Sequence, residues 1–165
     1  MESIQTELAV LLDVAIAASL SGVIGIEREK LKKPAGLRTN MIVGSISCFF
    51  VSISPELSRF IQINLPDDLI SIDPIRILHA IIVGVSFIGA GTILKSREEN
   101  SIQNLTTAST LLYSAGIGIS VAINGYILAI GLTIIAVLIN VLSYIKTFKY
   151  FSSNKNSNNI DNKQL

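Results

Sequence analysis

Long apolar segments dominate the pattern of hydrophobic and polar positions along the chain. A helix needs about 20 apolar residues to cross the ~30 Å hydrocarbon layer of a bilayer. Four segments meet this requirement, and they cover residues 8–26, 75–94, 105–123 and 126–145. The pattern therefore predicts an all-α, polytopic membrane protein.

A fifth segment, residues 37–57, is apolar without interruption only from 41 to 53, which covers ~20 Å as a helix and leaves a re-entrant segment open. The basic residues distinguish the two cases. If 37–57 spans, the five in 27–38, two in 95–104 and four after 145 share one side, eleven against two in 58–76. If it does not span, the division is seven against six. Cytoplasmic loops carry an excess of Lys and Arg, so we expect a bundle of five transmembrane helices with the N-terminus outside and the C-terminus in the cytoplasm.

The chain is expected to form one transmembrane domain over residues 1–148, followed by a disordered cytoplasmic tail over 149–165. The tail is rich in Asn, Ser and Lys and has no apolar period. Acidic rather than basic residues precede the first span, so we expect a retained helix and not a signal peptide. The pair Asn124-Gly125 predicts a tight turn that makes the last two helices an antiparallel pair.

Composition agrees with a membrane protein and excludes other classes. The chain is 50% hydrophobic and 15% charged, which is too apolar for an ordinary soluble domain of this size and excludes a disordered chain. The net charge is +1, and no dense basic face suggests nucleic-acid binding. The single cysteine, Cys48, cannot form an internal disulfide. The sequence contains no HExxH, no Gly-rich phosphate loop and no nucleophile with a base partner, so we expect no enzyme and no cofactor.

Five motifs lie at the boundaries of the spans, in a fixed order. They read GVIGIERE at 22–29, KPAGLRTN at 33–40, DPIR at 73–76, FIGAG at 87–91 and LTTA at 105–108. From about residue 8 to 145 the chain thereby resembles the MgtC/SapB family of bacterial inner-membrane proteins. It departs from the family pattern at Ala80, Ser86 and Leu112, where Gln, Gly and Trp are common.

The resemblance implies a multi-pass protein of the bacterial plasma membrane that is linked to magnesium homeostasis or adaptation to low magnesium. It implies a modulator or accessory subunit of other membrane machinery. A small transporter of Mg²⁺ or another solute is the alternative. The expected partners are the lipid bilayer, a membrane protein, Mg²⁺ and further copies of the chain, because five short helices enclose little pathway alone.

Two acidic residues are candidates near the outer side. Asp13 lies ~7–8 Å inside the first span, where a carboxylate is costly unless it faces protein or water. It either contacts a proton or cation or is a hydrated interfacial residue. Asp73 precedes Pro74 and is expected to cap the third span, and Arg76 is placed to pair with it.

The cytoplasmic side carries a second group of candidates, which are Glu27, Arg28 and Glu29 at the end of the first span and Arg38 and Asn40 at the start of the second. Carboxylates and guanidinium groups here could form a network in which Arg38 is the bidentate partner of Glu27 or Glu29. Anchoring in the lipid headgroups is the alternative.

A magnesium site would combine one or two carboxylates with water. Asp13 and Glu27 lie ~21 Å apart along one helix and cannot share an ion. Any site would therefore be either outer, with Asp13, Asp73 and additionally Asp67 and Asp68, or inner, with Glu27 and Glu29. The sequence leaves the metal ligands unassigned.

Small residues at close-packing spacing indicate where helices approach one another. A pathway lined by the Thr and Ser hydroxyls is the alternative. The packing candidates are Gly22, Gly25, Gly84, Gly89, Gly91, Thr106 and Thr110.

Overall fold

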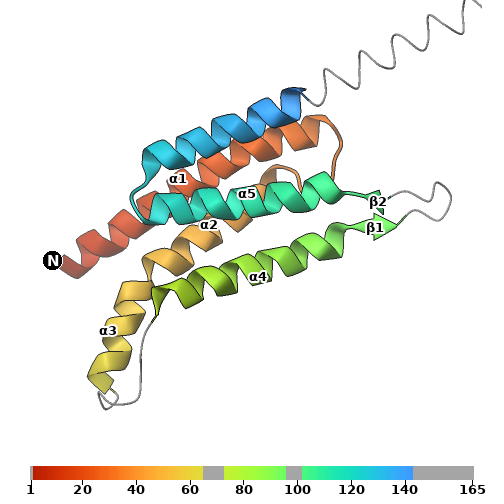
Figure 1. Ribbon diagram of the computed structural model, residues 1–165. Helices are drawn as coiled ribbons and strands as arrows, with labels where there is room; N and C mark the ends of the chain where they lie inside the picture. The colour runs from red at the N-terminus through yellow and green to blue at the C-terminus, as the bar shows by residue number, and fades with distance from the viewer. Residues whose placement is uncertain (1, 65–72, 96–101, 143–165) are drawn as a thin grey trace, which may run out of the picture.

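The computed structural model describes residues 2–64, 73–95 and 102–142, and this part of the chain is almost entirely helical (Figure 1). The tail predicted for 149–165 lies outside the described residues. Five helices are α1 (Glu2–Lys30), α2 (Leu37–Ser52), α3 (Ser54–Asn64), α4 (Pro74–Thr92) and α5 (Leu105–Ala122), and a further apolar helix covers Tyr126–Leu142.

Four helical segments are long and apolar enough to cross a membrane, namely Ile4–Lys30, Leu37–Asn64, Ile75–Thr92 and Leu105–Ala122. The all-helical expectation is confirmed at this level, and the chain is a multi-pass membrane protein. The second segment combines α2 and α3 into 28 residues. At their junction the amide of Ile53 donates to the carbonyl of Phe49, and the amide of Leu57 donates to the carbonyl of Ile53. Helical hydrogen bonding thus continues past the short apolar part.

Two short strands join α4 to α5, where the sequence predicted only a loop over 95–104. β1 (Leu94–Lys95) and β2 (Ile102–Gln103) are antiparallel, with Leu94 opposite Gln103. α4 and α5 run side by side in opposite directions (Figure 1). The chain that leaves one helix and enters the other is therefore brought within hydrogen-bonding distance.

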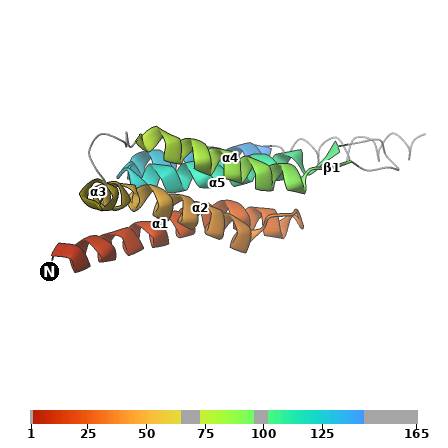
Figure 2. The ribbon, with the colours of Figure 1, turned by 90° about the horizontal axis from the view of Figure 1, so that it is seen from below.

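α5 lies at the centre of the packing. Figure 2 shows α1 and α4 on opposite sides of α2 and α5. One apolar cluster joins α5 to α1, α2 and the helix Tyr126–Leu142, and a second joins it to α2 and α4. The first contains Ala17, Ile24, Cys48, Ile117, Val121, Ala129 and Ala136. The second contains Val43, Ile81, Val85, Leu111 and Ala115.

Backbones touch where glycines allow α1, α2 and α5 to approach. A Cβ atom on Gly25 would lie 2.5 Å from the Cα of Leu37, and one on Gly118 would overlap the carbonyl oxygen of Gly44. A Cβ atom on Gly44 would in turn overlap the Ser21 side chain. These three contacts hold α1, α2 and α5 as one unit, which we call the packed unit.

The other packing candidates divide into two groups. A Cβ on Gly22 would meet the Met41 side chain at 3.0 Å, and one on Gly89 would meet Ala108 at 3.3 Å. Gly84 and Gly91 have nothing within 4 Å of the position of a Cβ. In the described part of the chain, no neighbouring helix contacts Gly84 or Gly91 at the position of a Cβ, so their role in helix packing stays a prediction.

The tight turn after α5 is confirmed. The amide of Gly125 donates to the carbonyl of Ser120 at 2.8 Å, and the amide of Asn124 donates to Val121 at 2.9 Å. Asn124 adopts the left-handed conformation, with φ 60°, which Asn tolerates better than most residues. The helix Tyr126–Leu142 then returns antiparallel to α5 (Figure 1) and packs on it through Ala129 and Ala136.

Candidate functional site

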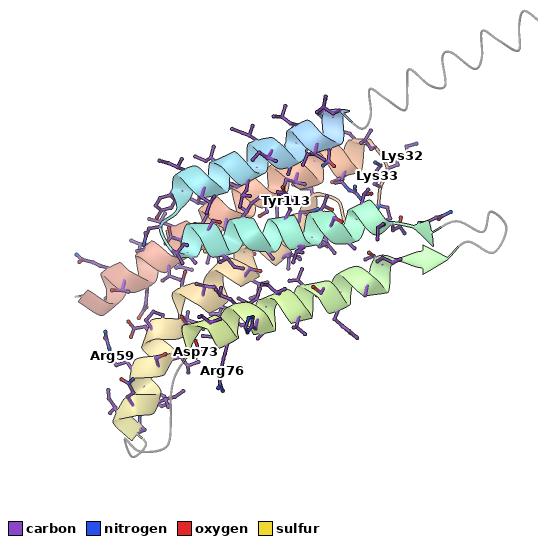
Figure 3. All side chains as sticks on the ribbon, viewed as in Figure 1. Lys32, Lys33, Arg59, Asp73, Arg76 and Tyr113 are labelled. Atoms are coloured by element: carbon purple, nitrogen blue, oxygen red, sulfur yellow. The ribbon has the colours of Figure 1, made fainter. Side chains whose placement is uncertain are left out.

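The charged residues separate to the two ends of the bundle. Figure 3 shows Lys32 and Lys33 at one end and Arg59, Asp73 and Arg76 at the other. We call the first the basic end; there α1 ends, α2 begins, α4 ends and α5 begins (Figure 1). It carries the motif residues Glu27 to Asn40, so the motifs on either side of the first loop are brought together.

Arg28 is the most unusual residue of the basic end, because its side chain is only 1% exposed. Its Nη1 donates to the hydroxyl oxygen of Thr106 at 3.4 Å, and its Nη2 donates to the hydroxyl oxygen of Thr107. Its Nε has no hydrogen-bond partner among the described residues. In the part of the chain that the structure describes, no carboxylate lies within 4 Å of this guanidinium. A buried charge is costly unless it is paired.

The two glutamates beside Arg28 differ in their surroundings. Glu27 is half-buried, and its Oε2 is buried without a hydrogen-bond partner in the described part of the chain. Glu27 lies beyond ion-pair distance of the Arg28 guanidinium, although its charge acts on Arg28 electrostatically. Glu29 is exposed, and its Oε2 accepts a hydrogen bond from the amide of Leu37 at 3.3 Å. That bond satisfies one of the free amides at the start of α2.

Of the two alternatives for Arg38, the clamp to the glutamates is not found among the described residues, and anchoring in the lipid headgroups stays a prediction. Arg38 is exposed, and it forms no ion pair with Glu27 or Glu29 in the described residues. The buried face of α2 contains Asn40, Val43, Gly44, Ser47 and Cys48. Position 38 is two residues before Asn40 and therefore lies away from that face. Arg28 of α1, and not Arg38, supplies the interior guanidinium.

Asn40 links three segments through its amide. Its Nδ2 donates to the carbonyls of Ala35 at 2.6 Å and Gly36 at 2.9 Å, and its Oδ1 accepts from the Ser114 hydroxyl at 2.8 Å. The Ser21 hydroxyl donates to the backbone oxygen of Ser114 at 3.4 Å. The result is a buried polar seam through α1, α5, α2 and the loop that precedes α2, and such networks fix helix positions.

At the opposite end, Asp13 contacts the turn that follows α5. The Tyr126 hydroxyl donates to Asp13 Oδ1 at 2.8 Å, and its oxygen lies 3.3 Å from Asn124 Oδ1. Asp13 is half-buried. A carboxylate inside an apolar span therefore has a protein partner, as its cost in lipid requires.

Asp73 has a structural role. Its carboxylate accepts a hydrogen bond from the amide of Ile75 at 2.9 Å, and Pro74 occupies the first turn of α4. The predicted capping is confirmed. Arg76 is exposed, and within the described chain it forms no ion pair with Asp73. An i, i+3 pair on a solvated helix start contributes little, and the carboxylate is already used by the cap.

No ready metal centre is present among the residues described. They include no group of three or more His, Cys, Asp or Glu side chains placed to hold a metal ion. Asp13 and Asp73 have different partners, and Glu27 and Glu29 point to different surroundings. The metal ligands therefore stay unassigned.

Sequence reasoning missed the partners of the predicted residues. Thr107 binds Arg28, Ser114 binds Asn40, and Tyr126 binds Asp13. Two local signals were present. The paired threonines open α5 inside a motif, and Tyr126 follows the tight turn directly. Neither signal states which distant residue is the partner.

Comparisons with known proteins agree with this arrangement. The model of the MgtC family matches residues 14–148. The Escherichia coli protein named "Putative magnesium transporter YhiD" is 36% identical over 84% of this chain and 62% of its own length. Protein MgtC of Salmonella typhimurium is 36% identical over 80% of this chain and 51% of its own length. Protein SapB of Bacillus subtilis is 36% identical over 71% of this chain and 49% of its own length.

The chain thus spans about half the length of the curated relatives that it matches. No solved structure matches it. The family model covers most of the chain and includes the basic end, and its match begins at residue 14, directly after Asp13. On these matches the chain belongs to the MgtC family.

Proposed function

We propose that this protein acts in the bacterial plasma membrane, during adaptation to low magnesium, as a modulator or accessory subunit of other membrane machinery and not as an enzyme. The link to magnesium is supported by the name of the Escherichia coli relative. The role of modulator is supported by one observation, which is the closed interior of the packed unit.

A pathway for an ion needs a gap lined by polar groups that are free to replace water. In the packed unit the helices instead touch through backbone at Gly25, Gly44 and Gly118. Interior hydroxyls on α5 are also engaged, whereas the buried Ser47 hydroxyl of α2 has no partner among the described residues. Ser114 donates to Asn40, and Thr110 donates to the carbonyl of Thr107 at 2.8 Å. Such an interior suits a rigid scaffold that acts through its surface.

The proposed topology has five spans, with the helix Tyr126–Leu142 as the described part of the fifth. The basic end then faces the cytoplasm, because cytoplasmic boundaries carry the excess of Lys and Arg. The N-terminus and the turn at Asn124 lie outside. Reporters fused at positions 34 and 124 should give cytoplasmic and external signals, and the same side for both would contradict this topology.

The second candidate is a small transporter of Mg²⁺ or another solute, working as an oligomer. Asp13 is the observation that favours it. This half-buried carboxylate lies inside an apolar span, where ionisable groups are commonly functional.

One pair of measurements separates the two functions. A strain that lacks the gene is complemented with the chain and grown in low magnesium, and the purified protein is placed alone in liposomes that contain a Mg²⁺-sensitive dye. A modulator restores growth and gives no more Mg²⁺ entry than protein-free liposomes. Entry of Mg²⁺ into liposomes that hold only this protein would reject the modulator and support the transporter.

A further inference from the structure

The N-terminus of α5 has no side-chain cap. Its N-cap residue, Asn104, adopts the left-handed conformation with φ 65° and makes no capping hydrogen bond. The Asn104 Nδ2 instead donates to the carbonyl of Thr92, at the end of α4, at 3.1 Å. The amides of Thr107 and Ala108 donate to the carbonyl of Asn104, and the helix start keeps the partial positive charge of an uncapped end at Leu105 and Thr106.

The buried guanidinium of Arg28 points at this same helix start. Both of its hydrogen bonds go to the first turn of α5, through the hydroxyls of Thr106 and Thr107. A full positive charge thus lies beside the positive end of a helix, with no carboxylate within 4 Å among the described residues. Two like charges brought together out of water are unfavourable, and an anion bound at the helix start would reduce the repulsion.

Thr106 connects the buried guanidinium of Arg28 to the surface of the protein. Its side chain is exposed, and its hydroxyl oxygen already accepts from Arg28. Its hydroxyl proton is therefore free to be donated to a ligand. A hydroxyl, the amides of a helix start and a guanidinium together are the donors that bind tetrahedral oxyanions.

Some neighbouring charges favour an anion at this helix start, and one opposes it. Lys32 and Lys33 lie at the same end of the bundle (Figure 3) and favour an anion. Glu27 opposes it and is close enough to interact with Arg28 electrostatically. Glu27 forms no ion pair with Arg28 within the described residues, so it offsets that charge only in part.

We infer that the N-terminus of α5, together with Arg28 and the Thr106 hydroxyl, is a binding site for a phosphate group. The inference does not depend on the proposed function. The phosphate belongs either to an anionic lipid headgroup or to a free phosphate compound, since the site lies where a span meets the headgroup region.

The test uses the full-length purified protein in a neutral detergent. Inorganic phosphate is titrated at constant ionic strength against chloride, and Tm is followed by circular dichroism. In parallel, the protein is reconstituted in phosphatidylcholine with or without phosphatidylglycerol, extracted, and examined by native mass spectrometry for retained lipid. A saturable rise of Tm with phosphate identifies a free phosphate compound as the source. Retention of phosphatidylglycerol without that rise identifies the lipid.

Three variants make the test specific. Thr106→Val removes the exposed hydroxyl at nearly constant volume and should weaken binding at least about fivefold, because a hydrogen bond to a charged ligand is lost. Ser109→Ala is the matched control on α5, since the Ser109 hydroxyl is exposed and bonds only to the carbonyl of Leu105. Arg38→Gln removes one exposed charge at the same end and measures non-specific attraction.

Arg28→Gln should abolish binding if the variant folds, which its helical signal shows. If it does not fold, Thr106→Val decides the question. The inference is overturned if neither phosphate nor phosphatidylglycerol binds. It is also overturned if Thr106→Val binds as well as Ser109→Ala, or if Arg38→Gln weakens binding as much as Thr106→Val.

Discussion

α5 and α4 are neighbouring apolar spans of 18 and 19 residues, yet they pack in opposite ways. Half of the spanning part of α5 is buried, against 17% for α4. α5 presents Thr110, Ser114 and Gly118 at intervals of four to its neighbours. α4 instead exposes large apolar side chains, with Phe87 80% exposed and Val83 68% exposed.

The difference shows that apolarity does not decide burial in this protein. Lipid is as apolar as a leucine side chain, so large aliphatic residues gain little by leaving it. Small residues and hydroxyls gain close backbone contact and hydrogen bonds, and these hold α5 in the packed unit. α4 keeps an apolar groove of about 430 Å³ against α2 and α3, lined in part by Gly84, Ile77 and Ile53.

The largest expected difference is between two matched changes, each of which adds a methyl group to one glycine, on α5 or on α4. Gly118→Ala forces a Cβ onto the carbonyl of Gly44 and should destabilise the protein by about 2–3 kcal/mol. Gly84→Ala enters open space and should change stability by no more than about 0.5 kcal/mol. Unfolding in mixed micelles, with membrane abundance by immunoblot, measures both. Equal effects would remove the distinction between the two helices.

The next effect concerns the buried polar seam. Asn40→Leu leaves the Ser114 hydroxyl and the carbonyls of Ala35 and Gly36 without their partner, and should cost about 2 kcal/mol. The matched change on α4, Ser86→Leu, alters an exposed position and should be nearly neutral. The same unfolding assay applies. A neutral Asn40→Leu would mean that backbone contacts alone hold the packed unit.

A smaller effect is expected at Asp13. Tyr126→Phe removes the donor to Asp13 and should cost about 0.5–1 kcal/mol. Asp13→Asn keeps an acceptor for Tyr126 but loses the charge, so membrane abundance should stay normal. For a modulator, growth in low magnesium should persist with Asp13→Asn. Lost growth at normal abundance would show a working carboxylate and favour the transporter.

The smallest effect is expected for Arg38→Ala. The side chain is exposed and unpaired within the described residues, so the free energy of unfolding should change by less than about 0.5 kcal/mol. Membrane abundance by immunoblot should also be unchanged. A large loss of stability would restore the predicted clamp to Glu27 or Glu29.

Features encoded by adjacent residues could be predicted from the sequence. The Asp73 cap before Pro74 and the Asn124-Gly125 turn depend on two or three neighbours, and both are confirmed. The long apolar segments likewise predicted the helices, because hydrocarbon tolerates no other isolated backbone.

Contacts that depend on helix rotation could not be predicted. Arg28 and Arg38 both lie in charged motifs beside the same loop, and only the rotation of α1 and α2 decides which of them is buried. Apolar residues surround both helices, so the sequence gives a weak signal for that rotation. The same holds for Gly44 against Gly118, and for Asp13 against Tyr126, which are 113 positions apart.

The short ladder between β1 and β2 and the hydrogen bond from Asn104 to Thr92 fasten α4 to α5 at the basic end. These contacts fix one end of α4, so a tilt of α4 would pivot at that end. α4 is about 28 Å long, at 1.5 Å per residue. A tilt of about 5° around the fixed end would therefore move the opposite end by about 2 Å. Asn104 precedes the first turn of α5, and the buried guanidinium of Arg28 bonds to that same turn. The fixed end of α4 and the Arg28 contact therefore lie at one helical turn. The displacement would be largest at the end of α4 that begins at Pro74.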